Sequence, residues 1–421
     1  MRMRDVGSDL ADTLFSSLRE ASLDPPGVTR ASYGAGERAA HAILCAAAQR
    51  LNLEISVDPI GTLFMTLPGA DRGAPPVLIG SHLDAVPHGG NFDGAAGVVM
   101  GLALIARLLA EGRRLRRDLV IIGIRAEEMI WFPMLYLGSR AAFGLLPKDA
   151  PDRLLRSDSG RSLACHMAEQ GFDPDFIRAG RRSLTPDQIH CFIEPHIEQG
   201  PVLVAQHIPV AVVTGIRGSI RYRACQATGE WGHAGAVPRR SRRDAVLAVA
   251  ALAHALEDFW DCCEAAGRDL VLTMGECFTD PLLQGITKIP GAVRFSLDIR
   301  SEDPAVLAEA ETLLGYQARL IAAARGVQID YGPVLPVSPA PMDGRLRATL
   351  RKGAAKVGIA FQEMASGAGH DALTFAGLGI PTAMLFIRNT GGSHNPAEAM
   401  AMEDFTAALE VLLAAIEEIA A

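Results

Sequence analysis

The spacing of hydrophobic residues predicts alternating helices and strands in the first part of the chain and again near its end. Helices are expected over residues 9–20, 37–52, 94–111, 343–358 and 403–420, and strands over 53–57, 62–67, 77–80, 118–124 and 382–387. The run DLVIIGI at 118–124 has no polar face after its first residue, which is typical of a strand covered on both sides. This alternation predicts an α/β domain.

Residues 214–332 follow a different pattern, which predicts a smaller domain. The segment VRFSLDIR at 293–300 alternates cleanly, so its apolar side chains share one face and its polar side chains the other. Another strand is expected over 218–228, with helices over 245–259 and 304–326. The proline-rich stretch 333–343 is interpreted as a linker. The sequence therefore predicts one domain from residues 1–213 and 333–421, with an α+β domain of residues 214–332 inserted into it.

Composition narrows the classes of function. A chain of 421 residues favours two domains, and 49% hydrophobic with 21% charged residues is ordinary for a soluble globular protein. The net charge of -8 argues against a nucleic-acid partner. A solvated loop or helix start is the preferred interpretation of the arginines Arg239, Arg240, Arg242 and Arg243, and a polyanion site is the alternative.

Cysteine usage and apolar runs indicate the compartment. The seven cysteines are odd in number and form no C-x-x-C, which favours free thiols in a reducing environment. The first residues, MRMRDVGSDLADTLF, lack the apolar run of a signal peptide. The longest apolar stretch, 97–106, is far shorter than a membrane span. We therefore expect a cytoplasmic protein with no membrane partner.

Candidate chemistry begins in the segment GSHLDAVPHGGNFDGAAG at 80–97, which follows a predicted strand. Imidazole and carboxylate are common ligands of hydrolytic divalent metals, so His82 and Asp93 are a candidate ligand pair. Asp84 is placed to orient His82 by accepting a hydrogen bond from the imidazole nitrogen that does not bind metal. The alternative is a glycine loop in which Asp93 caps a helix.

An acidic pair and two further histidines lie close to predicted strands. Glu127 and Glu128 follow the strand 118–124, where one carboxylate can bind metal and the other can act as base. His196 lies in FIEPHIEQGPVL, and His394 lies in a glycine loop after the strand 382–387. The alternatives are a solvated acidic turn and two core histidines. The sequence has no HExxH, P-loop, G-x-S-x-G or G-x-G-x-x-G motif.

Seven segments, taken in order, resemble the amidase, hydantoinase/carbamoylase family of dinuclear metallohydrolases, within the aminoacylase/carboxypeptidase-like clan. They are GSHLDAVPHGGNFDGAAG, RAEE, EPHIEQGP, GHAGAVPRRSRRDA, VRFSLDIR, SGAGHDA and GGSHNPAE. N-carbamoyl-L-amino acid hydrolases, β-ureidopropionases and allantoate amidohydrolases belong to this family. The resemblance runs from about residue 30 to the C-terminus, and the ordered set is far more specific than any one motif.

The resemblance implies two divalent metal ions per subunit, which are zinc, manganese, cobalt or nickel in this family. Asp93 would bridge them. His82 and His196 would complete one site, and Glu128 and His394 the other. Glu127 would be the general base, which takes a proton from the attacking water and passes it to the leaving amine.

The resemblance also implies the architecture and the remaining site residues. The catalytic domain would hold a mixed, mostly parallel sheet between helices, and the inserted α+β domain would be a lid and a homodimerisation domain. His233 would reach the partner subunit's active site and stabilise an oxyanion, and Arg300 would bind the carboxylate of a small-molecule substrate. Without the resemblance, both would be ordinary surface residues. Further substrate contacts are implied for Gln199, Thr287, Gly367, Ala368 and His370.

Two positions depart from the family pattern. Relatives usually continue Gly-Ser/Thr-Arg-Phe after the paired glutamates, where this chain has Met129, Ile130, Trp131 and Phe132. Thr287 stands where relatives usually carry an asparagine. Trp131 either packs in the core or flattens the pocket for an aromatic substrate.

The leading hypothesis is a metal-dependent amidohydrolase that cleaves a non-peptide C–N bond, as in an N-carbamoyl-L-amino acid or a related ureido acid. The alternatives are hydrolysis of an N-acyl amino acid or a dipeptide, and hydrolytic deamination of an aromatic amino acid. A non-catalytic metal-binding protein is a remote alternative, because the general base and all five ligands are retained.

Overall fold

The computed structural model describes residues 6–421, which form two compact units. The first unit contains the residues up to Thr214 and those from Met342 to Ala421, and the second contains Gly215–Pro341. The sequence placed the return to the first domain at residue 333, which is too early. Residues Val334–Val337 form strand β17, which pairs with β10 of the second unit, so the proline-rich stretch is only partly a linker.

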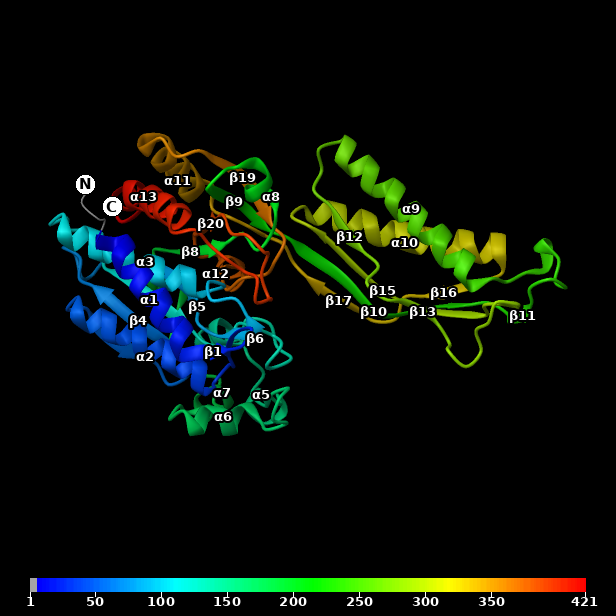
Figure 1. Ribbon diagram of the computed structural model, residues 1–421, viewed down its shortest axis with the longest axis horizontal. Coiled ribbons are helices and arrows are strands. Elements are labelled where there is room, and N and C mark those ends of the chain that lie inside the picture. Colours follow the sequence, from blue (N-terminus) through cyan, green and yellow to red (C-terminus); the bar gives the residue numbers. More distant parts are fainter. Residues whose placement is uncertain (1–5) are drawn as a thin grey trace. The chain divides into compact units, whose positions relative to one another are not determined.

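The first unit is a mixed sheet between helices (Figure 1). Its strands run in the order β9-β20-β8-β5-β7-β4-β3, and β19 also pairs with β9. Neighbours among β20, β8, β5 and β7 are parallel, whereas β9, β4 and β3 pair antiparallel. The expected architecture of a mixed sheet flanked by helices is confirmed, and its four central strands pair in parallel.

The strands of this unit are β1 (Leu23–Asp24), β2 (Gly27–Arg30), β3 (Glu54–Val57), β4 (Leu63–Leu67), β5 (Val77–His82), β6 (Ala85–Gly89), β7 (Leu119–Ile124), β8 (Cys191–Ile197), β9 (Val210–Ile216), β19 (Phe361–Ser366) and β20 (Thr382–Ile387). Its helices are α1 (Val6–Ser22), α2 (Ala35–Arg50), α3 (Ala95–Ala110), α4 (Leu137–Ala142), α5 (Ala150–Arg153), α6 (Leu163–Glu169), α7 (Pro174–Arg178), α8 (Val202–Gln206), α11 (Gly344–Val357), α12 (Ala372–Gly377) and α13 (Met402–Ile419).

Both faces of the central strands are buried, because every residue of β5, β7, β8 and β20 is buried. On one face, Ile79 and Ile121 belong to the large core that α1, α3 and α13 complete. On the other face, Phe192 of β8 stacks on Phe375 of α12, with ring centroids 3.9 Å apart. The apolar run of 118–124 indicated this double coverage correctly.

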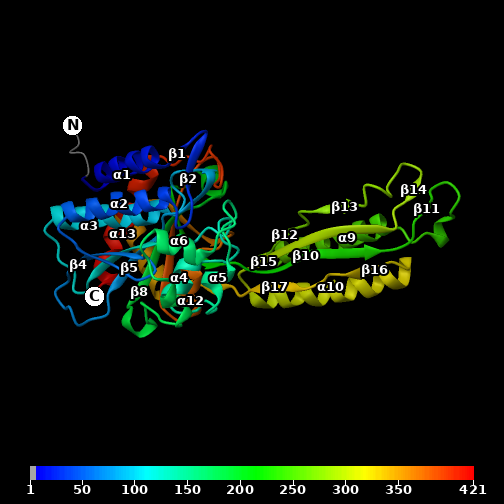
Figure 2. The same cartoon turned by 90° about the horizontal axis from the view of Figure 1, so that it is seen from below.

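The second unit packs two long helices on one face of an antiparallel sheet (Figure 2). Strand β15 (Ala292–Ser301) buries Val293, Phe295, Leu297 and Ile299 and leaves the alternate residues more exposed, as its alternation predicts. The other strands of this sheet are β10 (Gly218–Thr228), β12 (Val271–Thr273), β13 (Cys277–Thr279), β16 (Gln328–Asp330) and β17 (Val334–Val337), and the helices are α9 (Ala245–Ala265) and α10 (Pro304–Arg325). Strands β11 (Gly232–His233) and β14 (Lys288–Ile289) form a separate two-stranded sheet, and β18 (Ala340–Pro341) pairs with β9 at the end of the larger sheet.

Two further expectations concern thiols and membranes. All seven cysteines are free. Within residues 6–421, every helix is too short or too polar to span a bilayer.

Candidate metal centre

The predicted ligands lie at one edge of the parallel part of the sheet. His82 is the last residue of β5, Glu127 and Glu128 follow β7, His196 lies near the end of β8, and His394 follows β20. These four strands are neighbours and run parallel, so their carboxyl ends meet at the same edge. Open α/β sheets bind their ligands at this edge.

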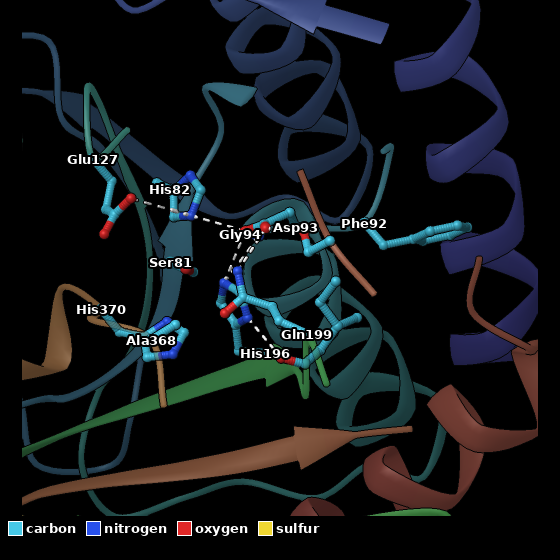
Figure 3. A network of polar contacts seen from close by, with 12 residues as sticks. Ser81, His82, Phe92, Asp93, Gly94, Glu127, His196, Gln199, Ala368 and His370 are labelled. Atoms are coloured by element: carbon cyan, nitrogen blue, oxygen red, sulfur yellow. Dashed lines mark hydrogen bonds and ion pairs between the residues drawn. The ribbon is translucent and has the colours of Figure 1, made fainter. Parts of the chain in front are cut away.

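Asp93 stands between the histidines (Figure 3). Its Oδ1 is 3.4 Å from Nε2 of His82 and 3.2 Å from Nε2 of His196. Its Oδ2 is 3.5 Å from Nε2 of His394, which is in turn 3.4 Å from Oε1 of Glu128. One carboxylate therefore faces two separate groups of ligand atoms.

These donors fit a pair of divalent cations. The groups His82–Asp93–His196 and Asp93–Glu128–His394 each place three nitrogen or oxygen atoms within 4.8 Å of one another, and Asp93 belongs to both. Imidazole nitrogens with carboxylate oxygens suit zinc, manganese, cobalt and nickel. A third group joins His82 and Glu128 with Glu127, which places the predicted base beside the same centre.

Gly94 is required by the close approach of the ligands. Its φ is 64°, and a Cβ atom at this position would lie 2.4 Å from Cε1 of His82. Gly94 also donates its backbone N–H to Nε2 of His196, at 3.2 Å. A side chain here would displace His82, which explains the glycine between Asp93 and α3.

Asp84 orients both the acidic pair and His82. Its Oδ1 accepts the backbone N–H of Glu127 and its Oδ2 that of Glu128, each at 3.1 Å, and Oδ2 also accepts the hydroxyl of Ser32 at 2.6 Å. Its Oδ1 lies 3.3 Å from Nδ1 of His82. The sequence predicted that Asp84 would hold the imidazole of His82. It did not predict that Asp84 would accept the backbone N–H groups of Glu127 and Glu128.

The charges of the centre shift the pKa values of its members in opposite directions. Burial disfavours the charge of Asp93, but the neighbouring imidazoles of His196 and His82 outweigh this effect and hold the pKa of Asp93 well below the usual range. Burial, reinforced by the nearby carboxylate of Glu128, raises the pKa of Glu127 well above its usual value. A carboxyl group with a raised pKa is suited to accept and release a proton near neutrality.

Two buried acids near the centre were missing from the predicted site. Glu398 accepts the backbone N–H groups of Phe92 and Asp93, at 2.8 and 3.2 Å, and so fixes the loop that carries Asp93. Glu194 of β8 accepts the hydroxyl of Ser81 at 2.6 Å and the N–H of Ala372 at 2.7 Å. In the sequence, Glu398 is the last residue of the segment GGSHNPAE, and nothing there indicated its role.

The predicted substrate contacts of the first unit lie around the same centre (Figure 3). Gln199 donates Nε2–H to Oδ2 of Asp93 at 2.7 Å, while its buried Oε1 has no hydrogen-bond partner among residues 6–421. The ring of His370 lies edge-on to that of His196, with centroids 4.4 Å apart. Ser366 ties the loop of Gly367 and Ala368 by donating to the Ala368 carbonyl at 2.8 Å.

His233 and Thr287 line one pocket of the second unit, about 360 Å³ in volume, together with Trp231, Leu283 and Lys288. Nδ1 of His233 accepts the backbone N–H groups of Gly235 and Ala236, at 3.1 and 3.2 Å. Because Nδ1 acts as acceptor, the proton of the neutral ring is on Nε2, which is left as a donor.

Arg300 lies on β15 of the second unit and is paired with a carboxylate of the same strand. Its Nη2 is 2.7 Å from Oδ2 of Asp298, which also lies 3.3 Å from Nε of Arg221. A substrate carboxylate would therefore meet a guanidinium already engaged with Asp298.

Trp131 belongs to a core of the first unit. It is 4% exposed, packs with the residues around α4–α7, and donates its indole N–H to the carbonyl of Ala85 at 3.0 Å. This placement agrees with the packing alternative for Trp131.

Comparisons with known proteins give the family of the chain. Residues 78–418 match the model of Peptidase family M20/M25/M40. An N-carbamoyl-L-amino acid amidohydrolase of Geobacillus stearothermophilus is 33% identical over 94% of this chain and 94% of its own. An allantoate amidohydrolase of Escherichia coli is 34% identical over 87% of each chain. A solved structure of an amidase of the hydantoinase/carbamoylase family from Burkholderia multivorans superimposes with a TM-score of 0.87 at 28% identity, covering 98% of each chain.

The expected family and the expected class of enzyme, a metal-dependent hydrolase of C–N bonds, are thereby confirmed. The chain belongs to peptidase family M20/M25/M40, among its hydantoinase/carbamoylase amidases.

Proposed function

We propose that this protein hydrolyses the non-peptide C–N bond of an N-carbamoyl-L-amino acid or a related ureido acid, with Glu127 as general base. The observation that carries the proposal is the position of Glu127. Its Oε2 lies 3.9 Å from Nε2 of His82, beside the two ligand groups that share Asp93, and burial keeps its pKa high. The family relationship supports the substrate class, since relatives named for such activities cover most of the chain.

His82, Asp93 and His196 would hold one divalent cation, and Asp93, Glu128 and His394 the other, with zinc, manganese, cobalt and nickel as candidates. When bound, the two cations lower the pKa of nearby water and offset the negative charge that develops on the carbonyl oxygen. Glu127 accepts the proton of the attacking water and then delivers it to the leaving nitrogen as the C–N bond breaks. Asp84 keeps Glu127 and Glu128 in place through their backbone N–H groups.

The remaining residues bind and orient the substrate. His233 donates its Nε2–H to the carbonyl oxygen, and the guanidinium of Arg300 binds the substrate carboxylate. Gln199, Thr287, His370 and the backbone of Gly367 and Ala368 complete the pocket. A homodimer formed through the second unit would bring His233 to the metal centre of the partner subunit. We also propose that the protein acts in the cytoplasm.

Ammonia release from a panel of N-carbamoyl and ureido acids, with each of the four metals, tests the proposal. Turnover should disappear with a chelator and return with metal. Glu127→Gln should keep two ions per chain and lose about 10²–10⁴-fold in kcat. Unchanged turnover after complete metal removal would refute the proposal, and bound metal without turnover on any amide would favour a non-catalytic binding protein.

A second candidate is hydrolysis of an N-acyl amino acid or a dipeptide, or deamination of an aromatic amino acid. The observation in its favour is the pocket of His233, where Trp231 and Leu283 provide apolar walls and Thr287 stands in place of the usual asparagine. The same panel, extended to acyl, dipeptide and aromatic-amine substrates, separates the two candidates by their kcat/KM.

A further inference from the structure

Glu37 of α2 is a fully buried carboxylate that is not one of the metal ligands. Its Oε2 accepts the backbone N–H of Tyr33 and Nη1–H of Arg125, each at 2.7 Å. Its Oε1 accepts the backbone N–H of Ala126 at 2.9 Å. A glutamate in the first turn of a helix commonly reaches back to an N–H group ahead of the helix, as Glu37 does toward Tyr33. Helix capping does not account for the bond to Ala126.

Ala126 occupies the turn that leads into the acidic pair. Its φ is 55°, a left-handed conformation that is uncommon outside glycine. Three successive N–H groups of this turn are each held by a buried carboxylate: Glu37 accepts that of Ala126, and Asp84 accepts those of Glu127 and Glu128. The turn is thus fixed at both of its ends by side chains from other segments.

Arg125 fixes the side chain of Glu37 in turn. The guanidinium is 4% exposed, donates Nε–H to the carbonyl of Gly61 at 2.8 Å, and lies over the ring of Phe172 at 4.7 Å from its centroid. A buried ion pair seldom stabilises a fold more than apolar residues of the same volume would. The pair is therefore better explained by the geometry it imposes than by stability alone.

We propose that Glu37 is a positioning residue: by holding the N–H of Ala126, it fixes the left-handed turn that presents Glu127 and Glu128 to the metal centre. The inference rests on the proposed function for the roles of Glu127 and Glu128. It goes beyond that function by assigning the placement of these residues to a side chain of α2.

Backbone hydrogen exchange in metal-free protein tests the contact without relying on turnover. In Glu37→Gln, the amides of residues 126–128 should exchange about tenfold faster, because one charge-assisted hydrogen bond is lost. Asp404→Asn is the matched control, since Asp404 forms two hydrogen bonds with Arg388, at 2.7 and 2.9 Å, in the same unit. This control should leave exchange at 126–128 unchanged. Equal exchange in wild type and Glu37→Gln would overturn the proposal.

Kinetics then test the consequence for catalysis. Glu37→Gln should lower kcat about 10–100-fold and weaken metal binding, with KM changed little, because substrate contacts stay intact. The pair variant Glu37→Met with Arg125→Met separates positioning from stability. Relative to Arg125→Met alone, it should regain thermal stability, since no charge is left unpaired, while its kcat stays low. Recovery of both thermal stability and kcat in the pair variant would show that the ion pair of Glu37 and Arg125 is only structural.

Different measurements test the role of Glu37 and the proposed function. If wild-type protein turns over none of the carbamoyl or ureido substrates, the proposed function fails, whereas the exchange and metal-affinity comparisons still decide the role of Glu37.

Discussion

The two halves of the candidate metal centre share Asp93 but differ in their exposure to solvent. In the buried half, the side chains of His82 and His196 are 3% and 0% exposed. In the open half, Glu128 is buried but the side chain of His394 is 54% exposed. Closed coordination is typical of ions that hold structure, and catalytic ions keep a position open to water or substrate. The half that contains His394 therefore has the solvent access that a catalytic ion requires.

The largest loss of metal binding and activity is expected from removing Asp93, the residue that both halves share. Asp93→Ala should abolish binding of both ions and lower kcat/KM on the order of 10⁴-fold, because the chemistry that the cations supply is lost. Metal content by mass spectrometry, measured with turnover, checks this outcome. A variant that still binds two ions per chain would show that Asp93 is not shared.

The metal affinity of the open half should depend on pH through the protonation of His394. A hydrogen bond with Glu128 raises the pKa of His394 to about 9, so the imidazole of the metal-free protein is protonated at neutral pH. A cation must displace this proton, so affinity at the open half should rise with pH, by about a thousandfold from pH 6 to pH 9, and then level off. Calorimetric titrations across this range measure the slope, and a flat profile would contradict the assignment of His394 as a ligand.

The halves should also release their ions at different rates. A chelator should remove metal in two phases that differ about tenfold or more, since solvent access limits ligand exchange. His394→Ala should eliminate the fast phase, and His196→Ala the slow one. Release in a single phase from wild-type protein would mean that the two halves are equivalent.

The smallest effect is expected from Glu398→Gln, which weakens support for the loop of Asp93 without removing a ligand. Metal affinity should fall up to about tenfold. Because Glu398 holds the shared residue, the loss should be similar in the two halves. An effect confined to one half, seen in the same two-phase release, would argue that Glu398 acts elsewhere.

The sequence predicted most of the long elements because their patterns are uninterrupted. The apolar run at 118–124 corresponds to β7 (Leu119–Ile124), and the strand at 382–387 corresponds to β20 (Thr382–Ile387). Strand β8 was not predicted, because Glu194 and His196 interrupt its apolar pattern although the whole strand is buried. Their polar atoms are satisfied by Ser81, Ala372 and Asp93, partners that only the folded chain brings near.

The candidate ligands were easier to find in the sequence than the residues that position them. His82 is the last residue of strand β5, and Asp93 and His394 lie in glycine-containing loops, where a polar residue next to an apolar run is easy to recognise in the sequence. Glu37 looks like an ordinary acid in the first turn of a helix, and its partner Ala126 is far away in sequence. Roles that depend on long-range contacts with backbone N–H groups leave no local pattern in the sequence.

The single carboxylate of Asp93 belongs to both candidate ligand groups, so two ions held there would depend on each other thermodynamically. An ion beside one oxygen would change the charge available at the other, and the two binding constants would then not be independent. Linkage requires that the first ion alter the affinity of the second by the same factor as the reverse. A change at either candidate group would therefore alter the metal affinity of the other group as well.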